Sequence, residues 1–181
     1  MIAATVRGLL VGRFQPFHLG HLAVLRELRA KHPEHTMILG IGSAQESYTW
    51  RNPFTAGERF EMIDRALREA HFAGWLAFPI VDIERHSVWV SHVESLLPPF
   101  DVVHTNNPLT RLLFERAGYA VESPTLIERG RFEGETIRRA LAKRVEWVDF
   151  VPPSVRDYLK ELNAEERLKL LADRKENPTG R

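Results

Sequence analysis

Residues 8–21 read GLLVGRFQPFHLGH, and this stretch carries the strongest fold signal in the chain. It starts with a short apolar run of the kind that forms a buried strand. A loop that contains Gly12 and Pro16 follows, because glycine and proline interrupt regular structure. A segment of helical period then begins around residues 18–21. The stretch therefore predicts a strand that turns directly into a helix.

The same alternation of a short apolar run and a longer helical segment recurs along the chain. Strands are expected at residues 6–11, 36–41, 75–81, 100–104 and 119–121. Helices are expected at residues 21–31, 55–71, 87–97, 107–116 and 136–144. Repeated strand–helix units imply parallel strands that are joined by right-handed crossovers, with helices on both faces of the sheet. The expected fold class is therefore α/β, with a doubly wound parallel sheet.

Two of these helices carry clear apolar stripes and recognisable start signals. The first stripe is Leu22, Leu25 and Leu28, and the second is Phe60, Ile63, Ala66 and Leu67. Thr55 and Glu58 have capping-box spacing, in which the hydroxyl and the carboxylate satisfy backbone donors at the helix start. Asn107 is expected to cap a further helix, with Pro108 in its first turn.

The pattern changes after residue 141, where no further strand is predicted. The tetrapeptide VPPS at residues 151–154 predicts a stop followed by a cap at Ser154, and residues 154–172 predict one or two amphipathic helices. This segment is too short to bury a core of its own, so one domain is expected over residues 1–181. Its expected parts are an α/β core at residues 1–145, a C-terminal helical appendage at 146–172 and a fraying polar tail at 173–181.

The composition limits the functions that the chain can have. The 181 residues include 25 Lys and Arg against 24 Asp and Glu, so the net charge of +1 draws neither nucleic acid nor an anionic membrane. Any anion-binding site must then be local. The absence of cysteine excludes disulfides, thiolate nucleophiles and cysteine-based zinc sites, and it fits the reducing cytoplasm. No window approaches the roughly 18 to 20 apolar residues of a membrane span, so a cytoplasmic protein is expected.

A local anion site is predicted at the start of the first helix. His18 and His21 stand at positions i and i+3, so they share a face beside backbone N–H groups that lack a helical partner. The helix dipole favours negative charge there, and Gly12 and Gly20 would allow a phosphate close approach to the main chain. A bare His-x-x-His pair is more often structural, but this loop context favours an anion site.

The loop is neither a P-loop nor a Gly-x-Gly-x-x-Gly dinucleotide loop. Instead, the run His18-Leu-Gly-His21 resembles the His/Thr-x-Gly-His signature of the nucleotidylyltransferase superfamily, which follows the first strand of a Rossmann-like fold. The longer run from Gly12 to His21 resembles the archaeal-type nicotinamide-nucleotide adenylyltransferases. Further segments are similar to that family, and the likeness covers roughly residues 7–172; these segments are GSAQ at 42–45, RNPFTAGER at 51–59, VDIE at 81–84 with Trp89, and NNP at 106–108.

The resemblance implies a role for each matching residue. The implied catalytic residues, which act on phosphates, are His18, His21, Arg13 and Arg138. The implied ATP-binding residues are Gly12, Phe14, Gln15, Gly20, Asn106, Asn107 and Thr136. The implied residues for nicotinamide mononucleotide (NMN) are Arg51, Asp82, Ile83 and Trp89, in which the tryptophan stacks on the pyridine ring. Taken alone, Trp89 would more often be a packing residue, and Arg51 a solvated one.

One segment departs from the family pattern. Residues 132–139 read FEGETIRR, which places Glu133 and Glu135 where the family has Ser and Thr. Arg138 falls on the family arginine, and Thr136 is displaced by one position. Two carboxylates would repel phosphate unless they point away or hold Mg²⁺. The neighbouring cations that could offset them are Arg129, Arg131, Arg139, Lys143 and Arg144.

The resemblance implies that the phosphate of NMN attacks the α-phosphorus of ATP in line and yields NAD and pyrophosphate without a covalent intermediate. No protein metal site is assigned, and Mg²⁺ is expected on the ATP phosphates. The implied partners are small-molecule nucleotides and further copies of the chain, since the family commonly forms hexamers. Two alternatives stay open: a sister adenylyltransferase for pantetheine phosphate or nicotinate mononucleotide, and a non-catalytic nucleotide-binding regulator. A nucleic-acid-binding protein is disfavoured by the near-zero net charge.

Overall fold

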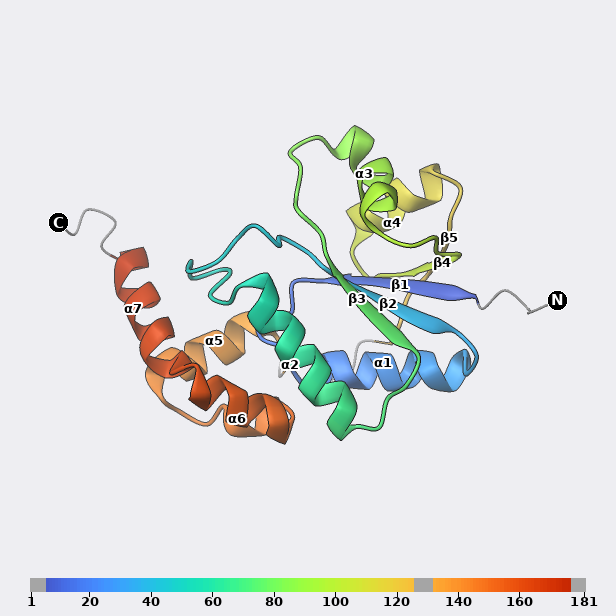
Figure 1. Ribbon diagram of the computed structural model, residues 1–181. Helices are drawn as coiled ribbons and strands as arrows, with labels where there is room; N and C mark the ends of the chain where they lie inside the picture. Colours follow the sequence, from blue (N-terminus) through green and yellow to red (C-terminus); the bar gives the residue numbers. More distant parts are fainter. Residues whose placement is uncertain (1–5, 126–131, 177–181) are drawn as a thin grey trace.

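The computed structural model describes residues 6–125 and 132–176, and it is built around one sheet of five parallel strands (Figure 1). The strands are β1 (Arg7–Gly12), β2 (Thr36–Ile41), β3 (Trp75–Pro79), β4 (Val102–His104) and β5 (Ala120–Glu122). Their order across the sheet is β3-β2-β1-β4-β5, so the chain starts at the centre and winds outward in both directions. This confirms the doubly wound Rossmann-like fold. In such sheets ligands bind beyond the carboxyl ends of the strands where the order reverses, here between β1 and β4.

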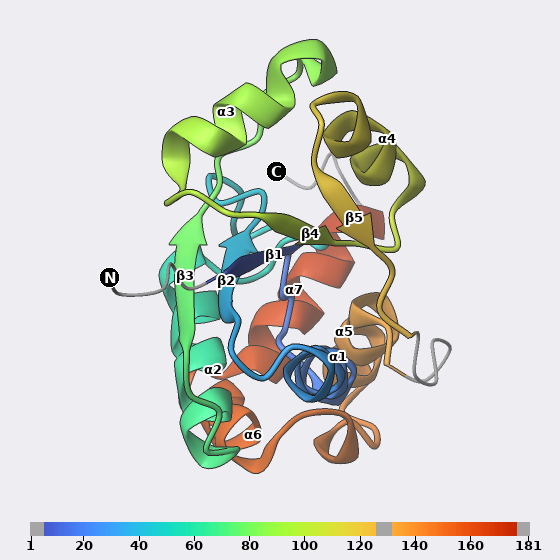
Figure 2. The same cartoon turned by 90° about the vertical axis from the view of Figure 1, so that its right-hand side faces the viewer.

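Helices cover both faces of the sheet (Figure 2). One face is covered by α1 (Leu19–Lys31), α2 (Ala56–Glu69), α5 (Gly134–Lys143), α6 (Pro153–Glu161) and α7 (Ala164–Glu176). The other face is covered by α3 (Trp89–Leu96) and α4 (Pro108–Arg116). Two short 3₁₀ turns, at His86–Val88 and Val148–Phe150, precede α3 and α6. The two faces have separate apolar cores because the sheet lies between them.

The predicted stripe of the first helix is confirmed, whereas that of the second is partly wrong. Leu22, Leu25 and Leu28 are buried as expected. In α2, Phe60 is 42% exposed, and the buried stripe instead begins at Arg59. The stripe repeats at the i, i+3 and i+4 spacing of a helix, which moves Phe60 to its flank. The remaining buried residues of α2 are Met62, Ile63, Ala66 and Leu67.

The helix-start predictions hold at two sites and fail at a third. The capping box of Thr55 and Glu58 is present, and the side-chain oxygen of Asn107 accepts hydrogen bonds from the first turn of α4. Ser154 is not a cap, because Pro152 takes that position in α6. The hydroxyl and N–H of Ser154 instead donate to Glu69 of α2, at 2.7 and 3.1 Å. A tertiary partner has replaced the expected local one.

The C-terminal segment is two helices that pack on the α/β core. Figure 1 shows α6 and α7 beside α2 and α5, and the buried side chains of Val155, Leu159 and Leu168 belong to the same core as those two helices. Helix α7 continues to Glu176, so residues 173–176 are helical and not part of a tail. Across the described ranges, none of the helices combines the length and apolarity that crossing a membrane requires.

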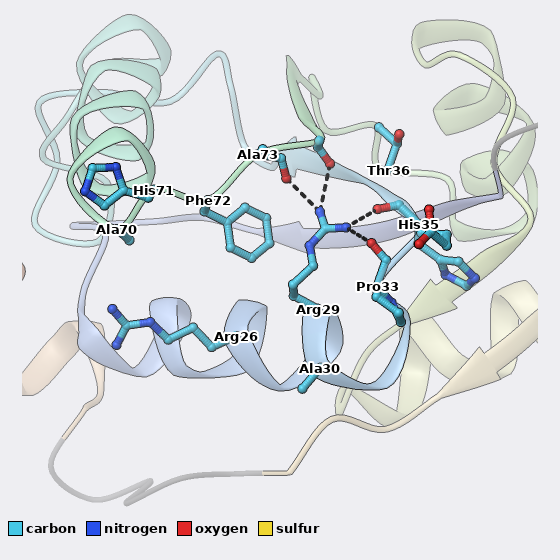
Figure 3. A pocket seen from close by; sticks show the side chains of 12 residues that line it. Arg26, Arg29, Ala30, Pro33, His35, Thr36, Ala70, His71, Phe72 and Ala73 are labelled. Atoms are coloured by element: carbon cyan, nitrogen blue, oxygen red, sulfur yellow. Dashed lines mark hydrogen bonds between the residues drawn. The ribbon is translucent and has the colours of Figure 1, made fainter.

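A pocket of about 630 Å³ lies at the opposite edge of the sheet from the strands' carboxyl ends (Figure 3). Arg29 is at its centre and donates hydrogen bonds to the carbonyl oxygens of Pro33, His35, Ala73 and Gly74, at 2.7 to 3.2 Å. Its guanidinium also lies 4.8 Å from the ring of Phe72. Because both terminal nitrogens bind main chain, this arginine ties together the loops that lead into β2 and β3.

Candidate functional site

Two adjoining cavities open at the carboxyl ends of the strands. The first, which we call the strand-end cavity, measures about 490 Å³ and is lined by residues that follow β1, β2, β3 and β4. The second, which we call the arginine cavity, measures about 690 Å³ and lies between the 48–51 loop, α5 and α7. Arg13 and Arg51 line both cavities, so two positive charges stand where the cavities meet.

The cavities bring together more than half of the residues that the sequence singles out. Among them, the strand-end cavity contains Gly12, Arg13, Arg51, Asp82, Ile83, Trp89 and Asn107. The arginine cavity contains Arg13, Arg51 and Arg138. The lining residues of neither cavity include His18, His21, Phe14, Gln15, Gly20, Asn106 or Thr136. Segments that are up to 125 positions apart therefore meet at one edge of the sheet, as the fold requires of parallel strands.

Trp89 and Asp82 are held in place on one wall of the strand-end cavity. The ring of Trp89, at the start of α3, packs edge-to-face against Phe114 with centroids 5.5 Å apart. The carboxylate of Asp82 accepts a 2.6 Å hydrogen bond from the hydroxyl of Ser43. The backbone N–H of Asp82 donates to the side-chain oxygen of Gln45 at 3.0 Å. An aromatic ring with a neighbouring fixed carboxylate suits a flat, polar heterocycle.

The two histidines of the signature stack on each other at the start of α1. His18 is the N-cap residue, and its ring centroid lies 3.6 Å from that of His21. The backbone N–H of His18 donates to Nδ1 of His21 at 3.2 Å, which leaves the proton of a neutral His21 on Nε2. Burial lowers the pKa of His18 to about 3, with a further contribution from the charge of Arg138. Burial, followed by the charge of His18, holds the pKa of His21 well below its usual range. Both rings are therefore neutral near pH 7.

The arginines that face the arginine cavity are only partly satisfied. Arg138 is buried, and its Nη1 donates to the carbonyl of Gln15 at 2.8 Å. Its Nε, and Nη1 of Arg13, are buried without a hydrogen-bond partner among the described residues. Burial, and then the charge of Arg13, lowers the pKa of Arg138 to about 10. The pKa of Arg13 is lowered by burial and then by Arg51. Guanidinium groups that repel each other and retain N–H groups without partners can bind an anion.

In residues 132–139, the segment that departs from the family pattern, the two glutamates lie in different surroundings. Glu133 is the exposed N-cap residue of α5. Glu135 lines the arginine cavity, and its carboxylate accepts a 2.8 Å hydrogen bond from Arg139 on the next turn. Thr136 is exposed in the first turn of α5. Of the neighbouring cations, Arg129 and Arg131 lie outside the described residues.

Several residues predicted for ATP make contacts with other parts of the chain. The amide of Gln15 donates to the carbonyl of Phe54 at 2.9 Å and accepts from its N–H at 3.0 Å. Phe14 is buried at 1% exposure. The amide nitrogen of Asn106 donates to the carbonyl of Pro124 at 2.8 Å. A Cβ atom on Gly20 would lie only 2.8 Å from the Cβ of Phe132, so this glycine is needed for packing. These residues shape the loops around the cavities.

The role of Arg59 was not predicted from the sequence. Its side chain is fully buried in α2 and donates to the carbonyl oxygens of Arg13 at 3.0 Å, Gly42 at 2.6 Å and Ser43 at 3.0 Å. A fourth bond reaches the carbonyl of Thr55. The signal was present in the helical pattern, since an arginine at this spacing from Met62 and Ile63 must share their buried face.

The contribution of α7 to the site was not predicted from the sequence either. Arg167 makes two 2.8 Å bonds to the carboxylate of Glu58, and its guanidinium lies 5.0 Å from the ring of Tyr48. Leu171 and Arg174, further along α7, line the arginine cavity. No local signal reveals this, because a cation on an amphipathic helix is usually solvated.

The described residues offer no cluster of three His, Cys, Asp or Glu side chains that could hold a metal ion. Glu135 is the one carboxylate among the residues that line the arginine cavity. One carboxylate beside several cations does not form a metal cage, but it can complete the coordination of an ion that arrives with substrate phosphates.

Comparisons with known proteins agree on one family. A family model described as cytidylyltransferase-like matches residues 9–166. The nicotinamide-nucleotide adenylyltransferase of Methanolobus tindarius is 44% identical over 90% of this chain and 92% of its own length. The corresponding protein of Archaeoglobus fulgidus is 45% identical over 93% of this chain and 99% of its own length.

Two solved structures share the fold at lower identity. A bifunctional NMN adenylyltransferase/ADP ribose pyrophosphatase from Francisella tularensis, complexed with AMP and a manganese ion, has a TM-score of 0.77 at 18% identity. The match covers 96% of this chain and 53% of that one. The nicotinic acid mononucleotide adenylyltransferase of Plasmodium falciparum, complexed with APC, has a TM-score of 0.62 at 11% identity over 90% of this chain and 98% of its own.

The lowered pKa of His18 predicts a specific acid sensitivity. In the unfolded chain this histidine protonates near its ordinary value of 6.5, whereas in the folded chain its pKa is about 3. Between these values the unfolded state binds more protons, so the free energy of unfolding falls as the pH falls. One such group contributes about 1 kcal/mol per pH unit within this window. Urea unfolding of the wild type and of His18→Asn at pH 7, 6 and 5 should show a shallower decline in the variant.

Asparagine is chosen because it can still cap a helix. The exposed His86 provides the control, and His86→Gln should decline as steeply as the wild type. Equal slopes for the wild type and His18→Asn would contradict the neutral, buried state of His18.

Proposed function

The chain belongs to the cytidylyltransferase-like family and, within it, to the nicotinamide-nucleotide adenylyltransferases, and on this premise we propose how it transfers the adenylyl group of ATP to NMN. The products are NAD and pyrophosphate. The observation that carries the proposal is that Arg13 and Arg51 line both cavities. With the two reacting phosphates at this junction, the nucleoside parts of the substrates would lie in the strand-end cavity and the β- and γ-phosphates of ATP in the arginine cavity.

The transfer proceeds by direct in-line attack. A 5′-phosphate oxygen of NMN bonds to the α-phosphorus of ATP while the bond from that phosphorus to the bridging oxygen of the β-phosphate breaks. The electron pair leaves with pyrophosphate. Because the nucleophile is already an anion at neutral pH, the protein needs no general base. Its residues hold the two anions together and stabilise the charge of the transition state.

Residues of both cavities bind the substrates. In the strand-end cavity, Trp89 stacks on the pyridine ring, while Asp82 and the main chain of Ile83 face the carboxamide. Arg51 binds the phosphate of NMN, and Arg138 binds the triphosphate of ATP. Arg13 lies at the junction, where it contacts both anions. The positions of Gly12 and Asn107 in the strand-end cavity support their assignment to ATP binding.

Of the two stacked, neutral histidines, His21 is the hydrogen-bond donor to phosphate in this proposal. Nε2–H of His21 is the donor for the α-phosphate, since its Nδ1 is occupied by the backbone N–H of His18. A neutral ring gives up less hydration than an imidazolium would, and it needs no proton transfer during the reaction. His18 supports it by stacking and by capping α1.

A divalent cation, Mg²⁺, accompanies the ATP phosphates in this proposal. Glu135 would complete its coordination from the arginine cavity, together with water. When bound, the ion neutralises charge on the triphosphate and on the leaving group. The predictions of a cytoplasmic location and of a homo-oligomer remain predictions.

The proposal is tested by incubating the purified chain with ATP, Mg²⁺ and one acceptor at a time. The acceptors are NMN, nicotinate mononucleotide and pantetheine phosphate, which separate the sister activities. NAD and pyrophosphate should form in equal amounts from NMN. If only another acceptor reacts, the chain is a sister enzyme, and if ATP or NAD binds without turnover it is a regulator.

Removal of the His21 donor should slow the reaction. His21→Ala should lower kcat by at least about 100-fold, the usual cost of losing one preorganised donor to developing charge. His21→Gln, which retains an N–H donor, should lose less. Circular dichroism establishes that both variants are folded. An unchanged kcat in His21→Ala would refute the assignment.

Removal of the Trp89 ring should affect one substrate. Trp89→Ala should raise the KM for NMN with little change in the KM for ATP, and Trp89→Phe should have a smaller effect because an aromatic face remains. Steady-state rates with each substrate varied in turn provide the measurement. A similar rise in both KM values would place Trp89 in packing against Phe114 instead of in substrate binding.

A further inference from the structure

The arginine cavity contains a cation that no motif predicts. Arg174, in the last turns of α7, lines it together with Arg13, Arg51 and Arg138. We propose that Arg174 binds the β- and γ-phosphates of ATP and the pyrophosphate product. This makes the C-terminal helix part of the substrate site. The inference rests on the proposed function, since it assigns a residue to one end of the same substrate.

The position of α7 beside the site is set by Arg167. This arginine and Glu58 form a two-bond ion pair in which both side chains are about 15% exposed. Glu58 also accepts from the N–H of Thr55 as part of the capping box of α2. The guanidinium of Arg167 lies near the rings of Tyr48 and Phe54, at 5.0 and 5.5 Å. These contacts tie α7 to the segment that carries Arg51.

Arg174 lies on the same face of α7 as this anchor. Arg167, Leu171 and Arg174 stand at positions i, i+4 and i+7, which place them in one row along the helix. Leu171, between the two arginines, is 6% exposed and packs inward. The side chain of Arg174 is exposed, so it lines the cavity while remaining accessible to a ligand.

The charges in the cavity call for a polyanion. Four guanidinium groups face one carboxylate, that of Glu135, which is itself paired with Arg139. Burial and mutual repulsion already lower the pKa of Arg13 and Arg138. A further cation in this cavity adds to the repulsion among the guanidinium groups unless a bound anion neutralises it. Several guanidinium groups that converge in one cavity are typical of a phosphate-binding site.

The geometry also indicates which phosphates Arg174 contacts. Arg13 and Arg51 line both cavities and stand where the two substrates meet. Arg138 and Arg174 line the arginine cavity alone, away from the cavity proposed for the pyridine ring. The part of ATP that extends beyond the reacting α-phosphate is its β- and γ-phosphates. These leave as pyrophosphate.

The reaction measured in both directions tests the assignment. Arg174→Gln should raise the KM for ATP, and the KM for pyrophosphate in the reverse reaction, by about 10-fold, the scale of one charge-assisted phosphate contact near the surface. The KM for NMN and the Kd for NAD should change by less than about twofold, because neither molecule carries these phosphates. Arg174→Lys should recover part of the loss, since it keeps the charge without the planar fork.

Lys169 provides the matched control on the same helix. It is exposed and lines a different pocket, beside Lys143 of α5, so Lys169→Gln removes one positive charge without altering the arginine cavity. Its KM values should equal those of the wild type. A rise in the KM for ATP that is as large as in Arg174→Gln would mean that net charge alone is responsible, and this would overturn the proposal.

Two other outcomes would also overturn it. Arg174→Gln with unchanged KM values for ATP and pyrophosphate would show that the side chain makes no contact with these groups. An equal loss of affinity for NAD and NMN, with a lower unfolding temperature, would show a structural role. Calorimetric titration of ATP and of pyrophosphate into the wild type and Arg174→Gln tests the contact without turnover. A wild type that forms no NAD would therefore count against the proposed function alone.

Discussion

The guanidinium of Arg59 is the interaction on which the site depends. It is fully buried and holds the carbonyl oxygens that follow β1 and β2 against α2. Burial lowers its pKa to about 10, and the charge of Asp82 opposes that shift. A buried cation is costly unless its donors are satisfied, and here main-chain oxygens satisfy them. The backbone of Arg13 and Ser43 is thereby fixed, and with it the Arg13 side chain at the cavity junction and the Ser43 hydroxyl that binds Asp82.

The electrostatics of the site complement this scaffold. The fold places the side chains of Arg13 and Arg138 at one cavity that has too few carboxylates to neutralise them. Each has a buried nitrogen with no partner among the described residues. The adjacent histidines stay neutral because burial disfavours their charged forms. The free protein therefore holds unbalanced positive charge at a fixed place. In the proposed reaction, two phosphorylated substrates supply the missing negative charge.

The C-terminal helices belong to the same unit as the sheet. The family model extends to residue 166, and the relative from Archaeoglobus fulgidus aligns over 99% of its length. Helix α6 is bonded to α2 through Ser154 and Glu69, and α7 through Arg167 and Glu58. Since Arg167 fixes α7 against the capping box of α2, the helix that looked like an appendage closes one side of the arginine cavity.

The sequence by itself determined the order of strands and helices, the stripe of α1, the caps at Thr55 and Asn107, and the family. These features are encoded within a few neighbouring residues, so periodicity, spacing and motif reveal them. Only the tertiary structure decided that Arg59 donates to the main chain after β1 and β2, that Gln15 binds Phe54, and that α7 reaches the cavity. The partners in these contacts are as far as 109 positions apart, as in Arg167 and Glu58. No local pattern specifies such a pair, because its energy depends on burial and on donors and acceptors that meet only after the chain has folded.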